Sequence, residues 1–279
     1  MKRTDSYCDG SWEQVFADMV YWKFNGELPA LSIASDVGFM EPTLKLGRGG
    51  KVLDLGCGLG HHSIELAARG YDVTGLEWSK PFLDVARQRA DEARRRADEA
   101  GVSVRFLHGD MTCMSFDSEF DAVVFWGNTF GMFSDEDNAK TLQGITRALR
   151  KGGSALIDTQ NYMALPERLE KQWHFHDEDQ SLLFLTEGTR DVLRARFGFT
   201  VTAIELSSGK RHRLPFSWRL YLLPELRQLV ATAGLDLVGV YGDDPNVVDW
   251  KNWKRGEPCP YAVEGFTEKA GKRILLCQR

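Results

Sequence analysis

The residues best suited to chemistry in this sequence are glycines and acids that stand where predicted strands end. Gly56, Gly58 and Gly60 lie within residues 52–62, where a short apolar strand passes into a glycine-rich turn and then into a helix. Such a turn exposes backbone N–H groups and lets a ligand approach the main chain closely. Asp54 ends the strand just before the turn. This stretch therefore predicts a ligand-binding loop.

Two further acids follow the next two predicted strands. Glu77 closes a strand over 71–78, and Asp110 follows a strand over 102–107. A carboxylate at the end of the second strand is suited to accept both hydroxyls of a ribose, and Trp78 beside it is placed to lie on an adenine face. Each acid taken singly also fits a solvated loop. Their order along the chain favours a nucleotide-like site.

The elements that must position these residues form a regular series between residues 51 and 161. Apolar strands over 51–56, 71–78, 102–107, 121–126 and 154–158 alternate with helical segments. Alternation with short connections predicts a parallel sheet with helices on both faces. Sheets of this type bind ligands at the carboxyl ends of their strands, where the glycines and acids stand.

The chain divides into four expected parts. Residues 1–45 form a helical lid rich in aromatic residues, and residues 46–161 form the binding core. Residues 162–216 have no strand–helix rhythm and are interpreted as an inserted substrate cap, with strand-like stretches over 181–186 and 199–206. Residues 217–279 are expected to complete the core sheet.

The glycine pattern resembles the first motif of class I S-adenosylmethionine-dependent methyltransferases. A dinucleotide-binding loop would read G-x-G-x-x-G, whereas here the spacing is G-x-G-x-G and His61 follows. The resemblance covers residues 50–160 well and extends weakly through 223–241. It implies a Rossmann-like, doubly wound, mostly parallel seven-stranded sheet with an antiparallel last strand, and S-adenosyl-L-methionine as cofactor.

The resemblance also implies roles for individual residues. The loop with Cys57 would pass beneath the methionine part of the cofactor, Glu77 would bind the ribose, and Asp110 the adenine amine. Met111 would add a backbone or apolar contact. The cofactor-binding residues expected on this basis are Asp54, Gly56, Cys57, Gly58, Gly60, Glu77, Trp78, Asp110, Met111, Trp126 and Asn128.

Catalytic residues are less clearly marked. Asn128, at the exit of the fourth strand, is the best candidate for lining the methyl-transfer channel, and a turn-forming asparagine is the alternative. His174 and His176 in the predicted cap are candidate general bases because imidazole accepts protons near neutrality. A surface position is the alternative for each. No metal-ligand constellation is expected.

Composition limits the partners and the compartment. The formal net charge is −5, which disfavours a nucleic-acid substrate because nucleic-acid binding relies on Lys and Arg neutralising phosphates. Five dispersed cysteines without a C-x-x-C pair predict a reducing cytoplasm, and no apolar run is long enough for a membrane span. The oligomeric state is not indicated.

These observations predict a methyltransferase that acts on an O or N atom, or a C atom, of a small molecule. An RNA methyltransferase is a weaker alternative, because the Asn/Asp-Pro-Pro-Tyr/Phe signature is missing. A nicotinamide-dependent oxidoreductase is disfavoured by His61. A member of the fold that binds S-adenosylmethionine without transferring methyl stays open, because a fold does not fix a reaction.

Overall fold

The main sheet of the protein has seven strands. In this computed structural model, which describes residues 11–25, 28–96, 102–161, 173–177, 179–243, 261 and 272–279, they run in the order β10-β11-β5-β4-β1-β2-β3. The strands are β1 (Lys51–Leu55), β2 (Asp72–Glu77), β3 (Val104–His108), β4 (Phe120–Phe125), β5 (Leu149–Gln160), β10 (Asp236–Tyr241) and β11 (Lys272–Gln278). Strands β1 to β5 pair in parallel, and β11 is antiparallel to both its neighbours. The expected Rossmann-like sheet with an antiparallel last strand is confirmed.

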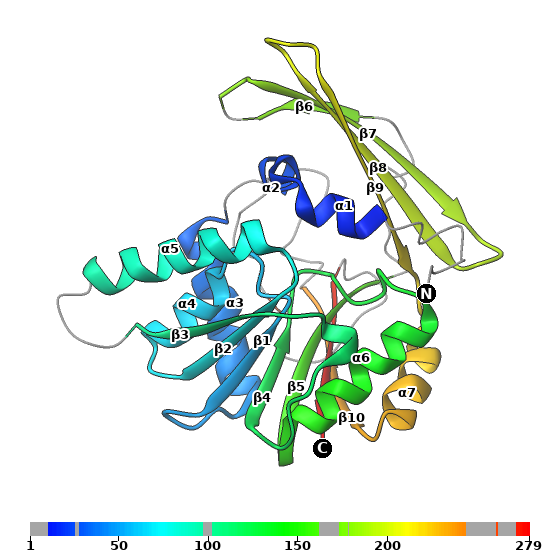
Figure 1. Ribbon diagram of the computed structural model, residues 1–279. Helices are drawn as coiled ribbons and strands as arrows, with labels where there is room; N and C mark the ends of the chain where they lie inside the picture. Colours follow the sequence, from blue (N-terminus) through cyan, green and yellow to red (C-terminus); the bar gives the residue numbers. More distant parts are fainter. Residues whose placement is uncertain are drawn as a thin grey trace.

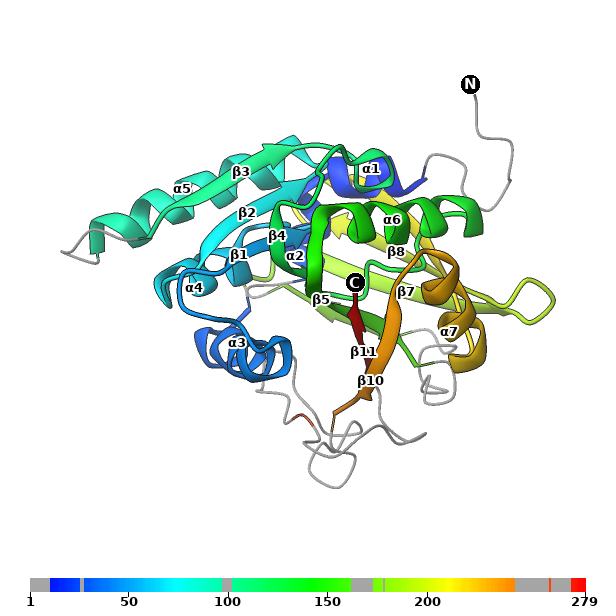
Figure 2. The same cartoon turned by 90° about the horizontal axis from the view of Figure 1, so that it is seen from below.

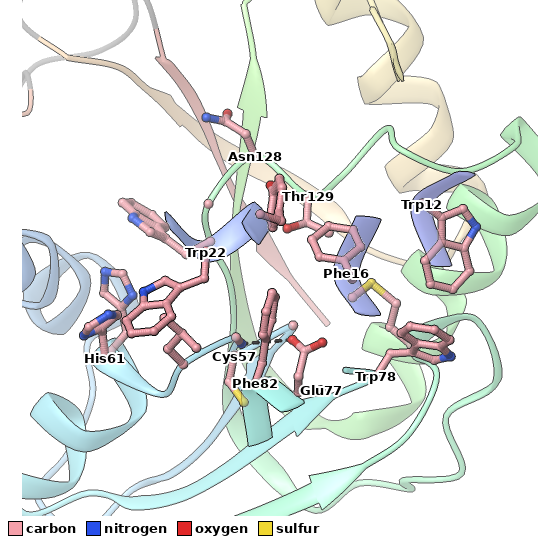
Figure 3. Close-up of a pocket in the computed structure, with 18 of the residues that line it drawn as sticks. Trp12, Phe16, Trp22, Cys57, His61, Glu77, Trp78, Phe82, Asn128 and Thr129 are labelled. Atoms are coloured by element: carbon pink, nitrogen blue, oxygen red, sulfur yellow. Dashed lines mark hydrogen bonds between the residues drawn. The ribbon is translucent and has the colours of Figure 1, made fainter. Parts of the chain in front are cut away.

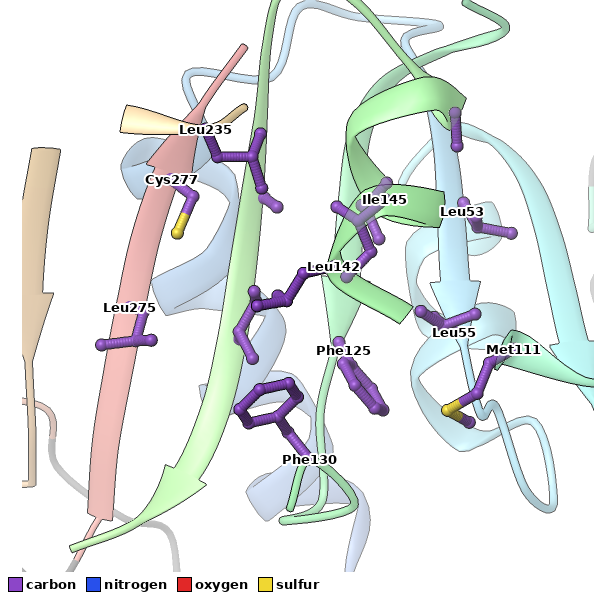
Figure 4. Close-up of a cluster of buried hydrophobic side chains, with 14 of the residues drawn as sticks. Leu53, Leu55, Met111, Phe125, Phe130, Leu142, Ile145, Leu235, Leu275 and Cys277 are labelled. Carbon is purple, nitrogen blue, oxygen red and sulfur yellow. The ribbon is translucent and has the colours of Figure 1, made fainter. Parts of the chain in front are cut away.

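Helices cover both faces of this sheet (Figures 1 and 2). On one face lie α6 (Asp135–Ala148) and α7 (Leu223–Thr232), and on the other α3 (Ala30–Leu44), α4 (His61–Ala68) and α5 (Lys80–Arg96). Side chains alternate along each strand, so Leu53 packs towards α6 while Val52 packs towards α3 and α4. Figure 4 shows Leu142 and Ile145 of α6 facing the strands. Burial on both faces explains why these strands read as continuous apolar runs.

Local sequence sets where the site-forming helices begin. Ser134 caps α6, since its Oγ accepts the Asp137 N–H at 3.1 Å. The Ser79 Oγ accepts the Phe82 N–H at 3.4 Å at the start of α5. Asp110 caps the short 3₁₀ helix η1 (Met111–Cys113). The helices α5 and η1 therefore start within three residues of a strand end, whereas α6 follows β4 after a longer loop.

A second sheet lies above the carboxyl edge of the main sheet (Figure 1). It is antiparallel, in the order β6 (Trp173–His176), β7 (Leu182–Asp191), β8 (Arg196–Glu205) and β9 (Arg211–Arg219). The sequence indicated two short strands here, whereas the structure has four and the sheet continues past residue 216. The strand β9 was missed because it starts with a basic cluster and contains Pro215. Proline is tolerated there because β9 is an edge strand.

Two short helices, α1 (Ser11–Ala17) and α2 (Met19–Asn25), lie between the two sheets (Figure 1). Val15 and Phe24 are buried in a cluster with Phe184, Phe199 and Phe216 of the second sheet. The aromatic N-terminal segment is thus held by the inserted sheet and faces the main sheet. None of the described helices combines the length and apolar character needed to cross a membrane.

Candidate functional site

A cavity of about 410 Å³ opens at the carboxyl ends of the parallel strands, within the range of roughly 300–1,000 Å³ usual for ligand pockets. The glycine loop and the exits of β2, β3 and β4 form one side, and α1 and α2 form the other (Figure 3). The structure brings most of the expected cofactor-binding residues together in its lining: Gly56, Cys57, Gly58, Glu77, Trp78, Asp110, Met111, Trp126 and Asn128.

The two later glycines of the loop differ in what they do. Gly58 has φ +54°, and a Cβ built on it would meet no atom within 4 Å, because the cavity lies there. Gly60 also has positive φ, but a Cβ on it would lie 2.9 Å from the Phe106 ring and 3.0 Å from Ala86. Gly60 therefore allows α4 to pack closely on α5 and β3 and does not line the cavity. Gly58 leaves room for a ligand against the main chain.

Glu77 connects the end of β2 to the glycine loop. Its Oε2 accepts the Gly58 N–H at 2.9 Å (Figure 3). Its Oε1 accepts the Ser79 N–H at 2.7 Å. Burial raises the pKa of the Glu77 carboxyl, and the two backbone N–H groups partly oppose this. The carboxylate is therefore oriented by the backbone at the edge of the cavity, as a group that binds a diol needs to be.

The Asp110 side chain is fixed by its role as a helix cap. Its Oδ1 accepts both the N–H and the Oγ–H of Thr112 at 2.8 Å. Trp78 contacts Trp12 of α1 edge to face, with ring centroids 5.1 Å apart, so the lid and the exit of β2 meet here. This end of the cavity has apolar walls and one carboxylate, a combination suited to a flat base that carries an amine.

Asp54 does not reach the cavity, contrary to expectation. It is buried, and its Oδ2 accepts the Ser63 hydroxyl at 2.6 Å, which ties β1 to α4. Burial raises the pKa of the Asp54 carboxyl. Since side chains alternate along a strand, a residue two before Gly56 faces the helices. Asp54 thus supports the glycine loop through its contact with α4, outside the cavity.

His174 and His176 also lie outside the cavity. Both are exposed on β6, the edge strand of the second sheet, while Phe175 between them packs against Phe184. Alternation along the strand directs the two histidines away from the side on which Phe175 is packed. This arrangement does not support a role for His174 and His176 as general bases at the pocket.

Two other histidines, His61 and His62, do line the cavity. Burial and the adjacent Arg89 guanidinium lower the pKa of His61 to about 3, so it is neutral at pH 7 and a weak base. The His62 Nε2 lies 2.9 Å from Oδ2 of the buried Asp36, and the Trp126 Nε1–H donates to the same oxygen at 3.2 Å. Asp36 therefore orients one histidine and one tryptophan at the cavity wall.

The lid residues of the cavity were only partly predicted. The aromatic character of the N-terminal segment was noted, and the structure selects Trp12, Phe16, Tyr21 and Trp22 as lining residues. Phe82, in the first turn of α5, was missed. Its position in the first helical turn after the end of β2 is the signal that would have indicated it. Tyr7, also within the expected lid over residues 1–45, lies outside the described residues.

Two buried polar atoms of the lining have no hydrogen-bond partner among the described residues. They are the Trp22 Nε1, a donor, and the Asn128 Oδ1, an acceptor. Unsatisfied buried groups are costly and rare, so each is explained most simply by a ligand that completes it. With the open space above Gly58, these two atoms show that the cavity fits a polar ligand. Within the described residues, no three His, Cys, Asp or Glu side chains gather as metal ligands.

The segment that carries the glycine loop and the strand exits is similar to known proteins. Residues 52–153 match the family described as a methyltransferase domain. The cypemycin N-terminal methyltransferase of a Streptomyces species is 28% identical over 241 residues, which cover 83% of this chain and 84% of that protein. A glycine/sarcosine N-methyltransferase of Halorhodospira halochloris is 25% identical over 249 residues, 86% of this chain and 82% of the relative.

The fold is also similar to that of a solved methyltransferase. The crystal structure of an S-adenosylmethionine-dependent methyltransferase from Clostridium acetobutylicum superimposes with a TM-score of 0.69 at 13% identity, over 97% of this chain and 98% of its own. The matched domain lies on the strands and loops that build the cavity. These similarities show an S-adenosylmethionine-dependent methyltransferase with a Rossmann-like fold, whose cofactor is S-adenosyl-L-methionine.

Proposed function

We propose that this enzyme methylates an amine nitrogen of a small molecule, with Asn128 at the methyl-transfer point. The observation that carries the proposal is the Asn128 Oδ1, a buried acceptor in the cavity wall without a partner among the described residues. A carboxamide oxygen can accept a hydrogen bond from an N–H group, but it is too weakly basic to remove a proton from the acceptor molecule. The arrangement therefore favours a nucleophile that attacks before it loses a proton.

A neutral amine meets this requirement, because its lone pair can attack while its N–H bonds stay intact. The resulting ammonium can lose its proton to water after transfer. A hydroxyl is a poor nucleophile until a base removes its proton. The cofactor supplies a methyl group already activated by its sulfonium, so the chain's own residues mainly align the acceptor and exclude water.

The relatives support nitrogen as the acceptor atom, since one is described as a glycine/sarcosine N-methyltransferase and another as the cypemycin N-terminal methyltransferase. The apolar lid and the −5 charge support a small molecule over a nucleic acid. The same charge disfavours the RNA methyltransferase alternative. The dispersed cysteines support a reducing, cytoplasmic location.

We assign the cofactor contacts as follows. Glu77 binds the ribose hydroxyls, Asp110 the adenine amine, and the loop around Gly58 the amino-acid tail. Trp126 and Met111 contribute walls of the cofactor site, and Cys57 contributes to it from the glycine loop. These roles are supported by the presence of all six residues in the cavity lining.

The test compares amines with matched hydroxy compounds. Purified enzyme and S-adenosylmethionine with a labelled methyl group are incubated with glycine or sarcosine, an alanine-terminated peptide and an amino sugar. The hydroxy analogues are glycolate, a lactate-terminated peptide and the corresponding sugar. We expect label transfer to at least one amine and to none of its hydroxy analogues. Transfer to hydroxy compounds, or tight binding of S-adenosylhomocysteine with no transfer to any amine, would contradict the proposal.

A further inference from the structure

The loop that follows β4 is held from the second sheet at several points. The Trp218 Nε1–H donates to the backbone carbonyl of Asn128 at 2.8 Å, and the Arg219 N–H donates to the Gly131 carbonyl at 2.7 Å. Asn128 and Trp218 are 90 residues apart in the chain. The loop also lines the cavity through residues 126–129 and Phe133. A wall of the site is thus fixed by residues that lie outside it.

A buried arginine adds to this connection. Arg196 on β8 is 7% exposed, and its guanidinium donates to the carbonyls of Phe133 at 3.2 Å and Met132 at 3.4 Å. It also donates to the Ser217 hydroxyl at 3.0 Å. A planar guanidinium with several donors can hold a loop in one orientation. Contacts from β8 and β9 therefore hold both ends of the segment.

No described residue of the second sheet lines the cavity itself. The sequence predicted this insertion to be a cap over the substrate. Its described residues instead affect the site indirectly, by holding the lid helices and the β4–α6 loop in place. On one side they bury Val15 and Phe24 of the lid helices, and on the other they bond to the β4–α6 loop. The sheet is a scaffold for two walls of the cavity.

The backbone of Asn128 is left-handed, with φ +59°. Asparagine enters this region more readily than other residues apart from glycine, but the conformation is still uncommon. Such a conformation persists when surrounding contacts define it. The Trp218 hydrogen bond fixes the carbonyl of Asn128 and with it the peptide plane that follows. The direction of the side chain, including Oδ1, depends on this backbone.

We propose that Trp218 is a positioning residue for methyl transfer: its indole N–H holds Asn128 so that Oδ1 accepts a hydrogen bond from the acceptor amine. This rests on the proposed role of Asn128 at the methyl-transfer point. It adds a residue of the inserted sheet to the machinery and assigns that sheet a part in selecting amines. Trp218 acts through Asn128 and touches neither substrate nor cofactor.

The test uses two cofactor analogues, so it needs no knowledge of the acceptor. S-adenosylhomocysteine lacks the methyl group, and sinefungin carries an ammonium group in its place. The ratio of their dissociation constants, measured by calorimetry, reports a hydrogen-bond acceptor at the transfer point. We expect the preference for sinefungin to fall about tenfold in Asn128→Gly, which tolerates the positive φ, and about fivefold in Trp218→Phe. The affinity for S-adenosylhomocysteine should stay unchanged in Trp218→Phe.

A packing control separates positioning from general damage. Trp218 stacks on Phe197, with centroids 6.4 Å apart and planes at 17°, so Phe197→Leu disturbs the same cluster but keeps the indole N–H. We expect this variant to lose thermal stability and to keep the wild-type sinefungin preference. Trp218→Tyr replaces Trp218→Phe if the latter does not bind S-adenosylhomocysteine.

Four results would contradict a part of this account, and they are distinguishable. An unchanged sinefungin preference in the Trp218 variant overturns the inference, and so does an equal loss in Phe197→Leu. If wild-type enzyme does not bind S-adenosylhomocysteine, the cofactor site itself is wrong. If Asn128→Gly keeps the preference, the role of Asn128 in the proposed function fails and the role of Trp218 fails with it.

Discussion

The carboxylate of Glu77 accepts the backbone N–H of Gly58 at 2.9 Å, which joins the end of β2 to the glycine loop after β1. The two residues are 19 positions apart, and both line the cavity. The second carboxylate oxygen of Glu77 accepts the Ser79 N–H. One buried acid thus organises the exits of two neighbouring strands before any ligand binds, which lowers the ordering cost of binding.

Replacing Gly58 by valine should abolish S-adenosylhomocysteine binding. The side chain would occupy the open space of the cavity, and a β-branched residue at φ +54° is strained. Gly209→Val is a matched control, because Gly209 also has positive φ and open space around it but lies in the turn between β8 and β9. Calorimetry should show normal affinity in the control. Retained affinity in Gly58→Val would disprove the role of the loop.

The affinity for S-adenosylhomocysteine should fall on acidification through the raised pKa of Glu77. Burial raises this pKa, so protonation, and with it the loss of an acceptor for the ribose hydroxyls, begins at a higher pH than for an exposed glutamate. Glu77→Gln should bind about 10- to 100-fold more weakly at neutral pH. It should also lack this acid limb in a titration of affinity against pH.

Glu225→Gln is the control for that titration. Glu225 likewise accepts a backbone N–H, from Leu222, but it lies at the start of α7 and does not line the cavity. Its variant should keep both the wild-type affinity and the acid limb. If the limb persists in Glu77→Gln, another group is responsible for it.

Removing the indole N–H of Trp22 should weaken the binding of ligands that carry the amino-acid tail. The Trp22 Nε1 is a buried donor in the lining without a partner among the described residues, and His61 at the start of α4 lines the same cavity. In Trp22→Phe we expect several-fold weaker binding of S-adenosylhomocysteine and unchanged binding of 5′-methylthioadenosine, which lacks the tail. Equal losses for both ligands would place Trp22 at the adenosine instead, and no loss would assign its N–H to the acceptor molecule.

The attachment of the lid should depend on pH through His212 on β9. Its Nδ1 lies 2.9 Å from the Asp18 carboxylate, between α1 and α2, and its Nε2 lies 2.9 Å from the Glu205 carboxylate. Glu205 and Asp18 raise the pKa of His212, while burial and Lys210 oppose the increase. Since the folded pKa exceeds the unfolded one, this stabilisation is complete below the unfolded pKa of about 6.5 and is lost as pH rises through the folded pKa.

Urea unfolding at a series of pH values measures this effect. The free energy of unfolding of wild type should decrease with rising pH above about 6.5, and His212→Gln should remove that part of the slope. His174→Gln, at an exposed histidine on the same sheet, should behave like wild type. An identical slope in His212→Gln and wild type would show that the pair does not titrate in this range.

The parallel sheet, the glycine loop and the acids at the strand ends could all be predicted from the amino-acid sequence. These are local features: strand and helix periods, caps such as Ser134, and glycines that mark turns are each written within a few residues. Because parallel strands align their carboxyl ends, the sequence order of Gly58, Glu77 and Asp110 was enough to bring them to one edge.

The way in which the cavity is closed could not be predicted in this manner. Three features follow from how the second sheet packs on the lid and the β4–α6 loop. His174 and His176 face away from the cavity, Trp12 contacts Trp78, and Trp218 donates a hydrogen bond to Asn128, 90 residues away in the chain. Such contacts depend on the relative placement of distant elements, and no local period encodes it.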